Sequence, residues 1–169
     1  MRRVALMASI LIAALVATGA VRAQDRAQSA TIIGTLNPQL ANGAIALDAG
    51  RIEEGIQLTL EGLELPAAPH DKAAGYANLC AGYALLKQWD EALQHCNTSL
   101  SIDKNNWRAF NNRAAIYTAK GQFESAIADI HAGLEMAPKS HTLLESLRIV
   151  QENKRAVSRP RHGAATRTL

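Results

Sequence analysis

The sequence predicts an all-α protein built as a stack of antiparallel helix pairs, because two of its segments repeat each other. When Ala73 is aligned with Trp107, 34 residues later, side chains of similar character coincide without a gap. The coinciding pairs are Tyr76 with Phe110, Cys80 with Ala114, Tyr83 with Tyr117, Trp89 with Phe123, Ala92 with Ala126, Cys96 with Ile130 and Ser99 with Gly133. A fixed period of this length is typical of stacked repeats rather than of one closed core.

Each repeat contains two helical runs joined by a polar turn, so we expect helix pairs at 36–64, 73–103 and 107–137. Aromatic or small residues recur at positions 4, 8 and 11 of a repeat, and small residues recur at positions 20 and 27. The turns are Lys87-Gln88 in one copy and Lys120-Gly121-Gln122 in the other. This placement lets two antiparallel helices approach closely. Each pair then leaves an apolar face that only a neighbouring pair can cover.

The pair at 36–64 is a weaker copy that is rich in glycine. Gly43, Gly50, Gly55 and Gly62 fall at positions 8, 15, 20 and 27 when this repeat begins at Leu36. Because a glycine costs about 1 kcal/mol relative to alanine in a helix interior, we expect this repeat to be intrinsically weak. The stretch 66–71 contains two prolines, which end the helix and lengthen the loop before the next repeat.

The run that follows Pro138 predicts a capping helix at 140–154. Leu143, Leu144, Leu147 and Val150 recur at helical spacing and form one apolar face. A stack of repeats needs such a terminal helix, which covers the last pair and presents a polar face to water. We expect the repeats and the cap to form one domain over residues 36–154.

The repeats resemble the tetratricopeptide repeat family. The first set of matching residues, at family positions 4, 7, 8, 11, 20, 24, 27 and 32, is Tyr76, Leu79, Cys80, Tyr83, Ala92, Cys96, Ser99 and Lys104. The second set is Phe110, Arg113, Ala114, Tyr117, Ala126, Ile130, Gly133 and Pro138. Lys104 replaces the usual proline and Arg113 the usual leucine. The resemblance implies a right-handed superhelical stack with three repeats near 36–69, 73–106 and 107–140, used for non-catalytic protein binding.

Residues 1–23 have the layout of a bacterial secretory signal peptide. Arg2 and Arg3 precede an apolar run over 4–20, and Val21 and Ala23 meet the small-residue requirement of a cleavage site before Gln24. We therefore expect a periplasmic or secreted protein whose mature chain begins with a flexible segment, 24–35. The alternative is an uncleaved membrane anchor, for which the run is short.

The net charge of +3 gives no argument for binding to nucleic acid. Three arginines leave with the signal peptide, and the remaining 15 basic residues balance the 15 acidic ones. The tail 155–169 is basic and lacks apolar periodicity, so we expect it to be disordered. A solvated terminus is the favoured interpretation of this tail; the alternative is an arm that touches acidic surfaces or lipid headgroups.

The sequence contains no pattern typical of catalysis or of a cofactor. The five histidines are scattered, and HExxH, CxxCH, GxSxG and phosphate-binding glycine patterns do not occur. His95 is next to Cys96, but neighbours on a helix point to different faces, and a zinc site needs four converging ligands. We therefore expect no enzyme activity, no cofactor and no bound metal.

Cys80 and Cys96 are the two cysteines, and the helix pair places them opposite each other. They occupy positions 8 and 24 of one repeat, which face each other when the turn lies near position 15 or 16. In an oxidising compartment a facing pair tends to form a disulfide. The alternative is two buried thiols that fill a seam of small residues.

The first helices of the pairs are expected to line a concave face that binds a partner. The groove candidates are Ala74, Ala77, Ala81 and Ala84 in one repeat, Arg108, Asn111, Ala115 and Thr118 in the next, and the amides of Asn78 and Asn112. An alanine floor with amide edges suits a peptide segment. The alternative is that the alanines only maintain helix propensity and close packing.

The tetratricopeptide resemblance also argues against one subclass of ligand. Repeats that hold the carboxylate ends of heat-shock chaperones use a basic clamp, and this chain has Ala77, Ala81, Thr142 and Ser146 at four of its positions. Two functions remain as hypotheses. The chain is a periplasmic or envelope module that binds a segment of an unknown envelope protein, or it is a structural protein that associates with further copies of itself.

Overall fold

The computed structural model describes residue 32 and residues 37–158. The signal peptide predicted at 1–23, the segment 24–35 apart from Ile32, and residues 159–169 of the tail lie outside the described residues. Within them the chain forms seven helices, with bounds α2 Pro38–Asp48, α3 Ile52–Glu64, α4 Pro69–Leu85, α5 Trp89–Ile102, α6 Trp107–Ala119, α7 Phe123–Met136 and α8 His141–Ser158. The described part of the chain contains no strand, which confirms the all-α prediction.

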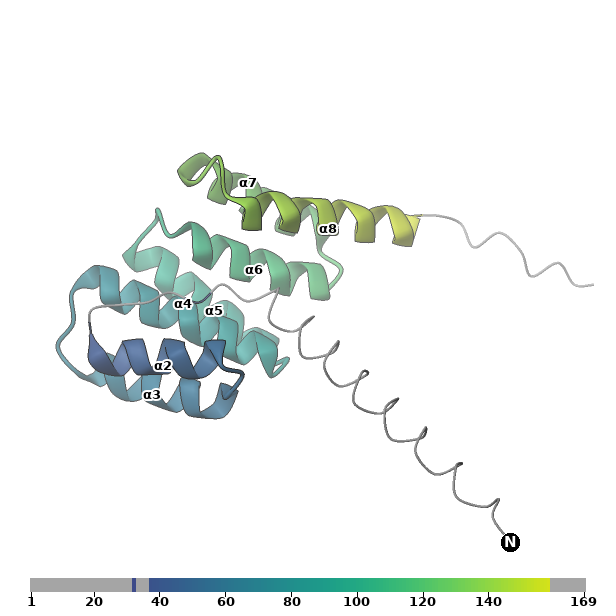
Figure 1. Ribbon diagram of the computed structural model, residues 1–169. Coiled ribbons are helices and arrows are strands. Elements are labelled where there is room, and N and C mark those ends of the chain that lie inside the picture. The colour runs from purple at the N-terminus through teal and green to yellow at the C-terminus, as the bar shows by residue number, and fades with distance from the viewer. Residues whose placement is uncertain (1–31, 33–36, 159–169) are drawn as a thin grey trace, which may run out of the picture.

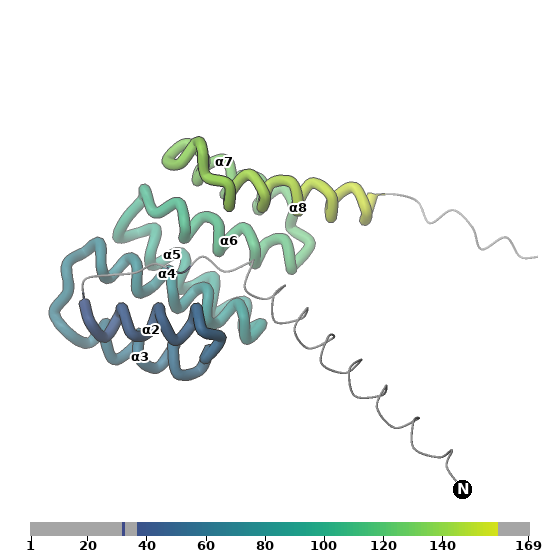
Figure 2. Tube along the Cα trace, viewed as in Figure 1, coloured from purple at the N-terminus to yellow at the C-terminus, as the bar shows by residue number. Residues whose placement is uncertain are grey.

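The helices form three antiparallel pairs, α2–α3, α4–α5 and α6–α7, which stack in chain order and are followed by α8 (Figure 1). The first helices of successive pairs are neighbours, since α2 contacts α4, α4 contacts α6, and α6 contacts α8. Figure 2 shows the same order along the Cα trace, from purple to yellow. The three predicted pairs are therefore present, and one face of the stack is made by first helices.

Three turns share one backbone feature, which supports the alignment of all three repeats. Gly50, Lys87 and Gly121 each occupy position 15 of their repeat and have positive φ values of 76°, 61° and 72°. Glycine adopts this left-handed conformation without a steric penalty, whereas lysine does not. The turn of the glycine-rich repeat thus has the same geometry as the two better-matched ones.

Two helix ends differ from the sequence expectation. The helix α4 begins at Pro69, four residues before the expected start, because proline is favoured in the first turn of a helix, where its missing N–H is not needed. The helix α8 continues to Ser158, so residues 155–158 are helical, although the sequence analysis assigned them to a disordered tail. An ion pair of 2.8 Å between Lys154 and Glu124 joins this end of α8 to α7.

The glycines of the first pair allow α2 and α3 to approach closely. A Cβ atom at Gly55 would lie 2.6 Å from Cγ and 2.8 Å from the backbone nitrogen of Leu47. A Cβ atom at Gly62 would lie 2.9 Å from the backbone nitrogen of Leu40. The expectation of a weak repeat considered helix propensity alone, whereas these glycines permit packing that a larger residue would prevent.

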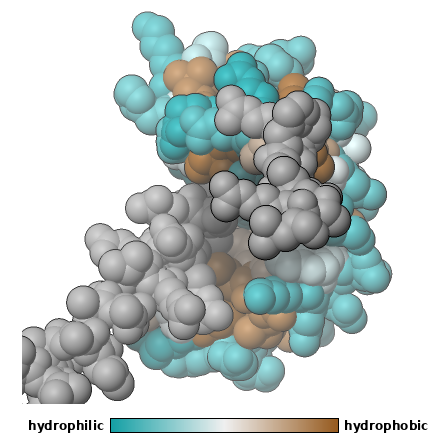
Figure 3. Space-filling model, turned by 90° about the vertical axis from the view of Figure 1, so that its right-hand side faces the viewer, coloured by the Kyte–Doolittle hydropathy of each residue, from teal (hydrophilic) through white to brown (hydrophobic). Residues whose placement is uncertain are grey.

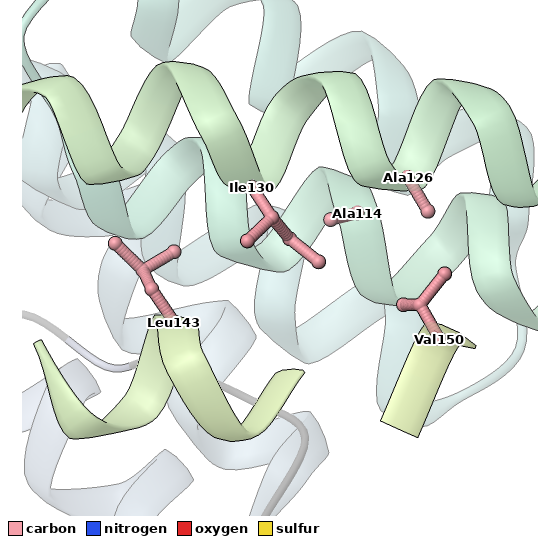
Figure 4. Close-up of a cluster of buried hydrophobic side chains, with 5 residues drawn as sticks. All are labelled: Ala114, Ala126, Ile130, Leu143 and Val150. Carbon is pink, nitrogen blue, oxygen red and sulfur yellow. The ribbon is translucent and has the colours of Figure 1, made fainter. Parts of the chain in front are cut away.

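The last pair and α8 share a core. Ala114, Ala126, Ile130, Leu143 and Val150 form this cluster. Figure 4 shows the side chains of Leu143 and Val150 extending from α8 toward those of α6 and α7. Leu144 was assigned to the same apolar face, but its side chain is 47% exposed. None of the helices in residues 37–158 is long and apolar enough to cross a membrane.

Candidate binding groove

A groove of about 380 Å³ lies on the face made by the first helices. Its lining includes Ala81, Ala84 and Leu85 of α4, Ala115, Thr118 and Ala119 of α6, and Ser146, Ile149 and Asn153 of α8. Figure 3 shows hydrophobic residues, in brown, exposed among hydrophilic ones on one side of the molecule. Because α4, α6 and α8 belong to three successive units, the groove depends on how the repeats stack rather than on any one repeat.

The alanines predicted to form the groove floor divide into two groups. Ala81, Ala84 and Ala115 line the groove, and Ala81 is itself only 1% exposed. Ala74 and Ala77 are 1% and 0% exposed and belong to a core cluster with Leu100 and Ala109. For these two alanines the structure matches the alternative interpretation, which is close packing between α4, α5 and α6.

The predicted asparagines connect the first helices to one another. Asn112 donates a hydrogen bond of 3.1 Å from its side-chain amide to the carbonyl oxygen of Ala77, which links α6 to α4. The hydroxyl of Ser146 donates to Oδ1 of Asn111 over 2.8 Å, which links α8 to α6. Asn78 is fully buried, so its amide lies inside the stack. The bonds of Asn111 and Asn112 thus link the three helices that form the groove walls.

Arg108 was also a groove candidate, but it does not line the groove. Its guanidinium carbon lies 4.4 Å from the ring centroid of Trp107, the neighbouring residue at the start of α6. Such a cation–π contact holds the positive charge against an aromatic face.

Sequence reasoning missed the contribution of α8 to the groove. It treated 140–154 only as a cap, yet Ser146, Ile149 and Asn153 line the groove wall. Their spacing of three and four residues places them on one side of a helix, which was the available signal. Leu85, Lys87 and Trp89, at the turn between α4 and α5, were likewise not among the predicted residues although they line the groove.

The seam between α4 and α5 contains the disulfide and an aromatic stack. Cys80 and Cys96 are bonded, with Cα atoms 5.1 Å apart, as predicted from their positions in the repeat. The ring of His95 stacks on Tyr83 and Tyr76, with centroid distances of 5.1 Å and 6.0 Å. Burial lowers the pKa of His95, and the negative charge of Glu91 partly opposes this.

The described residues hold no group of three or more histidine, cysteine, aspartate or glutamate side chains that could bind a metal ion. His95 stacks on Tyr83, and its neighbour Cys96 forms the disulfide with Cys80.

The chain is similar to known proteins in both sequence and fold. A family profile described as tetratricopeptide repeat matches residues 95–128. Peptidyl-prolyl cis-trans isomerase FKBP42 of Arabidopsis thaliana is 30% identical over 82 residues, which is 48% of this chain and 22% of that protein. The chain spans less than a quarter of the length of the curated relatives that it matches.

Two solved structures show the likeness in fold. The TPR domain of Sgt2 from Aspergillus fumigatus has a TM-score of 0.64 at 16% identity, covering 83% of this chain and 93% of that one. The second TPR domain of human RPAP3, determined with the HSP70 peptide SGPTIEEVD, has a TM-score of 0.58 at 20% identity, covering 76% of this chain and 97% of that one. With the 34-residue period, the paired helices and the repeated turn, these matches show that the chain has the fold of a tetratricopeptide repeat domain and that residues 95–128 match that repeat.

Proposed function

We propose that the chain is a non-catalytic interaction module that holds a segment of another protein in the groove between α4, α6 and α8. The observation that carries this proposal is the groove itself, which has an apolar lining and lies on the face made by the first helices. Such a site is large enough to bury side chains of an extended or helical segment. The peptide-bound RPAP3 domain, which shares the fold, supports a peptide as the kind of ligand.

Site-specific photo-crosslinking in the native cell tests this function. A photoreactive amino acid at Ile149, which lines the groove, should give a crosslinked product with a second protein. The matched control is the same amino acid at Gln94, an exposed residue of α5 that does not line the groove. Equal products from both positions, or none from Ile149, would contradict the proposal. A product of twice the mass of the chain would support the alternative, self-association.

We also propose that the module acts in the bacterial periplasm or outside the cell, after cleavage between Ala23 and Gln24. The charged, apolar and small-residue parts of 1–23 support export, and the disulfide supports an oxidising compartment. Sequencing the N-terminus of protein isolated from the periplasm tests this. A membrane-bound form that begins at Met1 would contradict cleavage without affecting the proposed groove.

A further inference from the structure

The groove has almost no charge. Among the described residues that line it, sixteen in all, Lys87 alone carries a full charge, and it lies in the turn after α4. Three of its polar lining residues already donate hydrogen bonds within the protein: Asn112 to the carbonyl oxygen of Ala77, Thr118 to that of Ala114, and Ser146 to Asn111. A ligand in this groove therefore meets mainly methyl and methylene groups.

Four cations of α6 and α8 are held by other groups. Arg108 of α6 lies over the ring of Trp107, and Arg113 pairs with Asp129 of α7. On α8, Arg148 pairs with Glu145 and Glu152, and Lys154 pairs with Glu124. Lys87, in the turn after α4, is the one cation among the described lining residues. Away from Lys87, a carboxylate in the groove would lose water without gaining a cation in return, and such burial is strongly unfavourable.

From this charge pattern we infer that the groove takes an uncharged segment of a partner protein, anchored by a branched aliphatic side chain. The inference rests on the proposed function and names the ligand class of that site. Small side chains at Ala81, Ala84 and Ala115 leave room at the floor, and Leu85 and Ile149 provide aliphatic walls. Burial of an apolar side chain there removes apolar surface of both partners from water. The acidic peptide bound by the RPAP3 domain is thus not the ligand type for this chain.

Three labelled peptides of one length test the inference by fluorescence anisotropy with the full chain. The first is SGPTIEEVD, which has three acidic residues and a free carboxylate. The second, SGPTIQQVN, and the third, SGPTILLVA, carry C-terminal amides and no acidic side chain. We expect SGPTILLVA to bind at least about tenfold more tightly than SGPTIEEVD, and its affinity to change little between about 50 mM and about 500 mM salt, since screening affects charge pairs.

Two variants assign the binding to the groove. Ala84→Trp fills the floor and should abolish binding of SGPTILLVA, whereas Gln94→Trp on the exposed side of α5 should leave it unchanged. Ala115→Lys adds a cation to the lining and should reverse the order of the peptides.

Tighter binding of SGPTIEEVD to the unaltered chain would overturn the inference and leave the proposed function intact. Failure of all three peptides to bind, with a crosslinked partner still found at Ile149, would also overturn the inference alone. Failure of both experiments would overturn the proposed function as well.

Discussion

Arg113 and Asp129 form a two-point ion pair across the seam between α6 and α7. Nε and Nη2 of Arg113 each donate to one carboxylate oxygen of Asp129, both over 2.7 Å. A third bond of 2.6 Å runs from Nη1 to Oδ1 of Asn97 on α5. The hydrogen bond to Asp129 raises the pKa of Arg113. This pair explains why an arginine stands at position 7, where the preceding repeat has Leu79.

In the preceding repeat, neither member of this ion pair is present. Leu79 and His95 occupy the positions that Arg113 and Asp129 occupy one repeat later. Leu79 is fully buried in a cluster with Leu47 and Ile56, whereas the side chains of Arg113 and Asp129 are 19% and 10% exposed. A buried leucine at position 7 has thus been replaced by a partly buried arginine that pairs with an aspartate at position 23.

Asp129→Ala should lower the free energy of unfolding by about 2 kcal/mol, because it leaves the partly buried guanidinium of Arg113 without its carboxylate partner. Arg113→Leu with Asp129→Ala should recover most of this loss, since an apolar side chain replaces the charge. Chemical denaturation of the two single variants and the double variant gives the coupling energy. If the single losses simply add in the double variant, the pair is not coupled.

Reduction of the Cys80–Cys96 disulfide should lower stability by about 3 kcal/mol, because the bond closes a loop between residues separated by 16 positions. Thermal unfolding with and without reductant measures this loss. In the Cys80→Ala, Cys96→Ala double variant, reductant should have no effect. Two titratable thiols in protein purified without reductant would refute the bond in solution and leave the repeat structure unaffected.

Gly55→Ala should destabilise the protein by about 1–3 kcal/mol, although alanine is the better helix former. The added Cβ would lie 2.8 Å from the backbone nitrogen of Leu47, so α2 and α3 must move apart. Gln57→Ala, at an exposed position of the same helix, is the matched control and should change stability by less than about 0.5 kcal/mol. Stabilisation by Gly55→Ala would show that helix propensity outweighs packing in this pair.

The stability of the protein should fall as the pH drops below the ordinary pKa of histidine, 6.5. Burial lowers the pKa of His95 in the folded state, so the unfolded chain binds the proton first. The stabilisation is complete above the unfolded pKa and is lost as the pH falls toward the folded one. Urea unfolding between about pH 7.5 and about pH 5 should therefore show a steeper loss for the natural chain than for His95→Phe, which keeps a ring beside Tyr83. Equal slopes would contradict this role of His95.

The period in the sequence was enough to predict the helix pairs and the facing positions of Cys80 and Cys96, because both depend on contacts within one repeat. Cys80 and Cys96 face each other inside a single pair, and the spacing of the pair determines this. The groove depends on contacts between repeats, which the spacing does not give. Ala74 and Ala81 were both predicted to face the groove. Ala74 instead belongs to a core cluster with Ala109, whereas Ala81 lines the groove.

The role of the glycines in the first pair and the groove side of α8 also could not be predicted from the spacing of residues alone. Helix propensity assigns Gly55 a cost, and only the position of Leu47 shows what the missing side chain permits. The apolar spacing of α8 predicted its buried face correctly at Leu143 and Val150. The spacing of Ile149 and Asn153 places them on one side of α8, but only the position of α8 beside α6 shows that this side faces the groove.

The measurement that tests the central claim most directly is the change in backbone amide NMR shifts when the SGPTILLVA amide is added to the full chain. The account predicts that the largest shifts fall on groove residues of all three helices, among them Ala84, Ala115 and Asn153, and that exposed positions of α5 and α7, such as Gln94 and His131, stay unchanged. Shifts concentrated on α5 and α7, with Ala84 and Ala115 unaffected, would contradict the claim that this protein binds its partner in the groove.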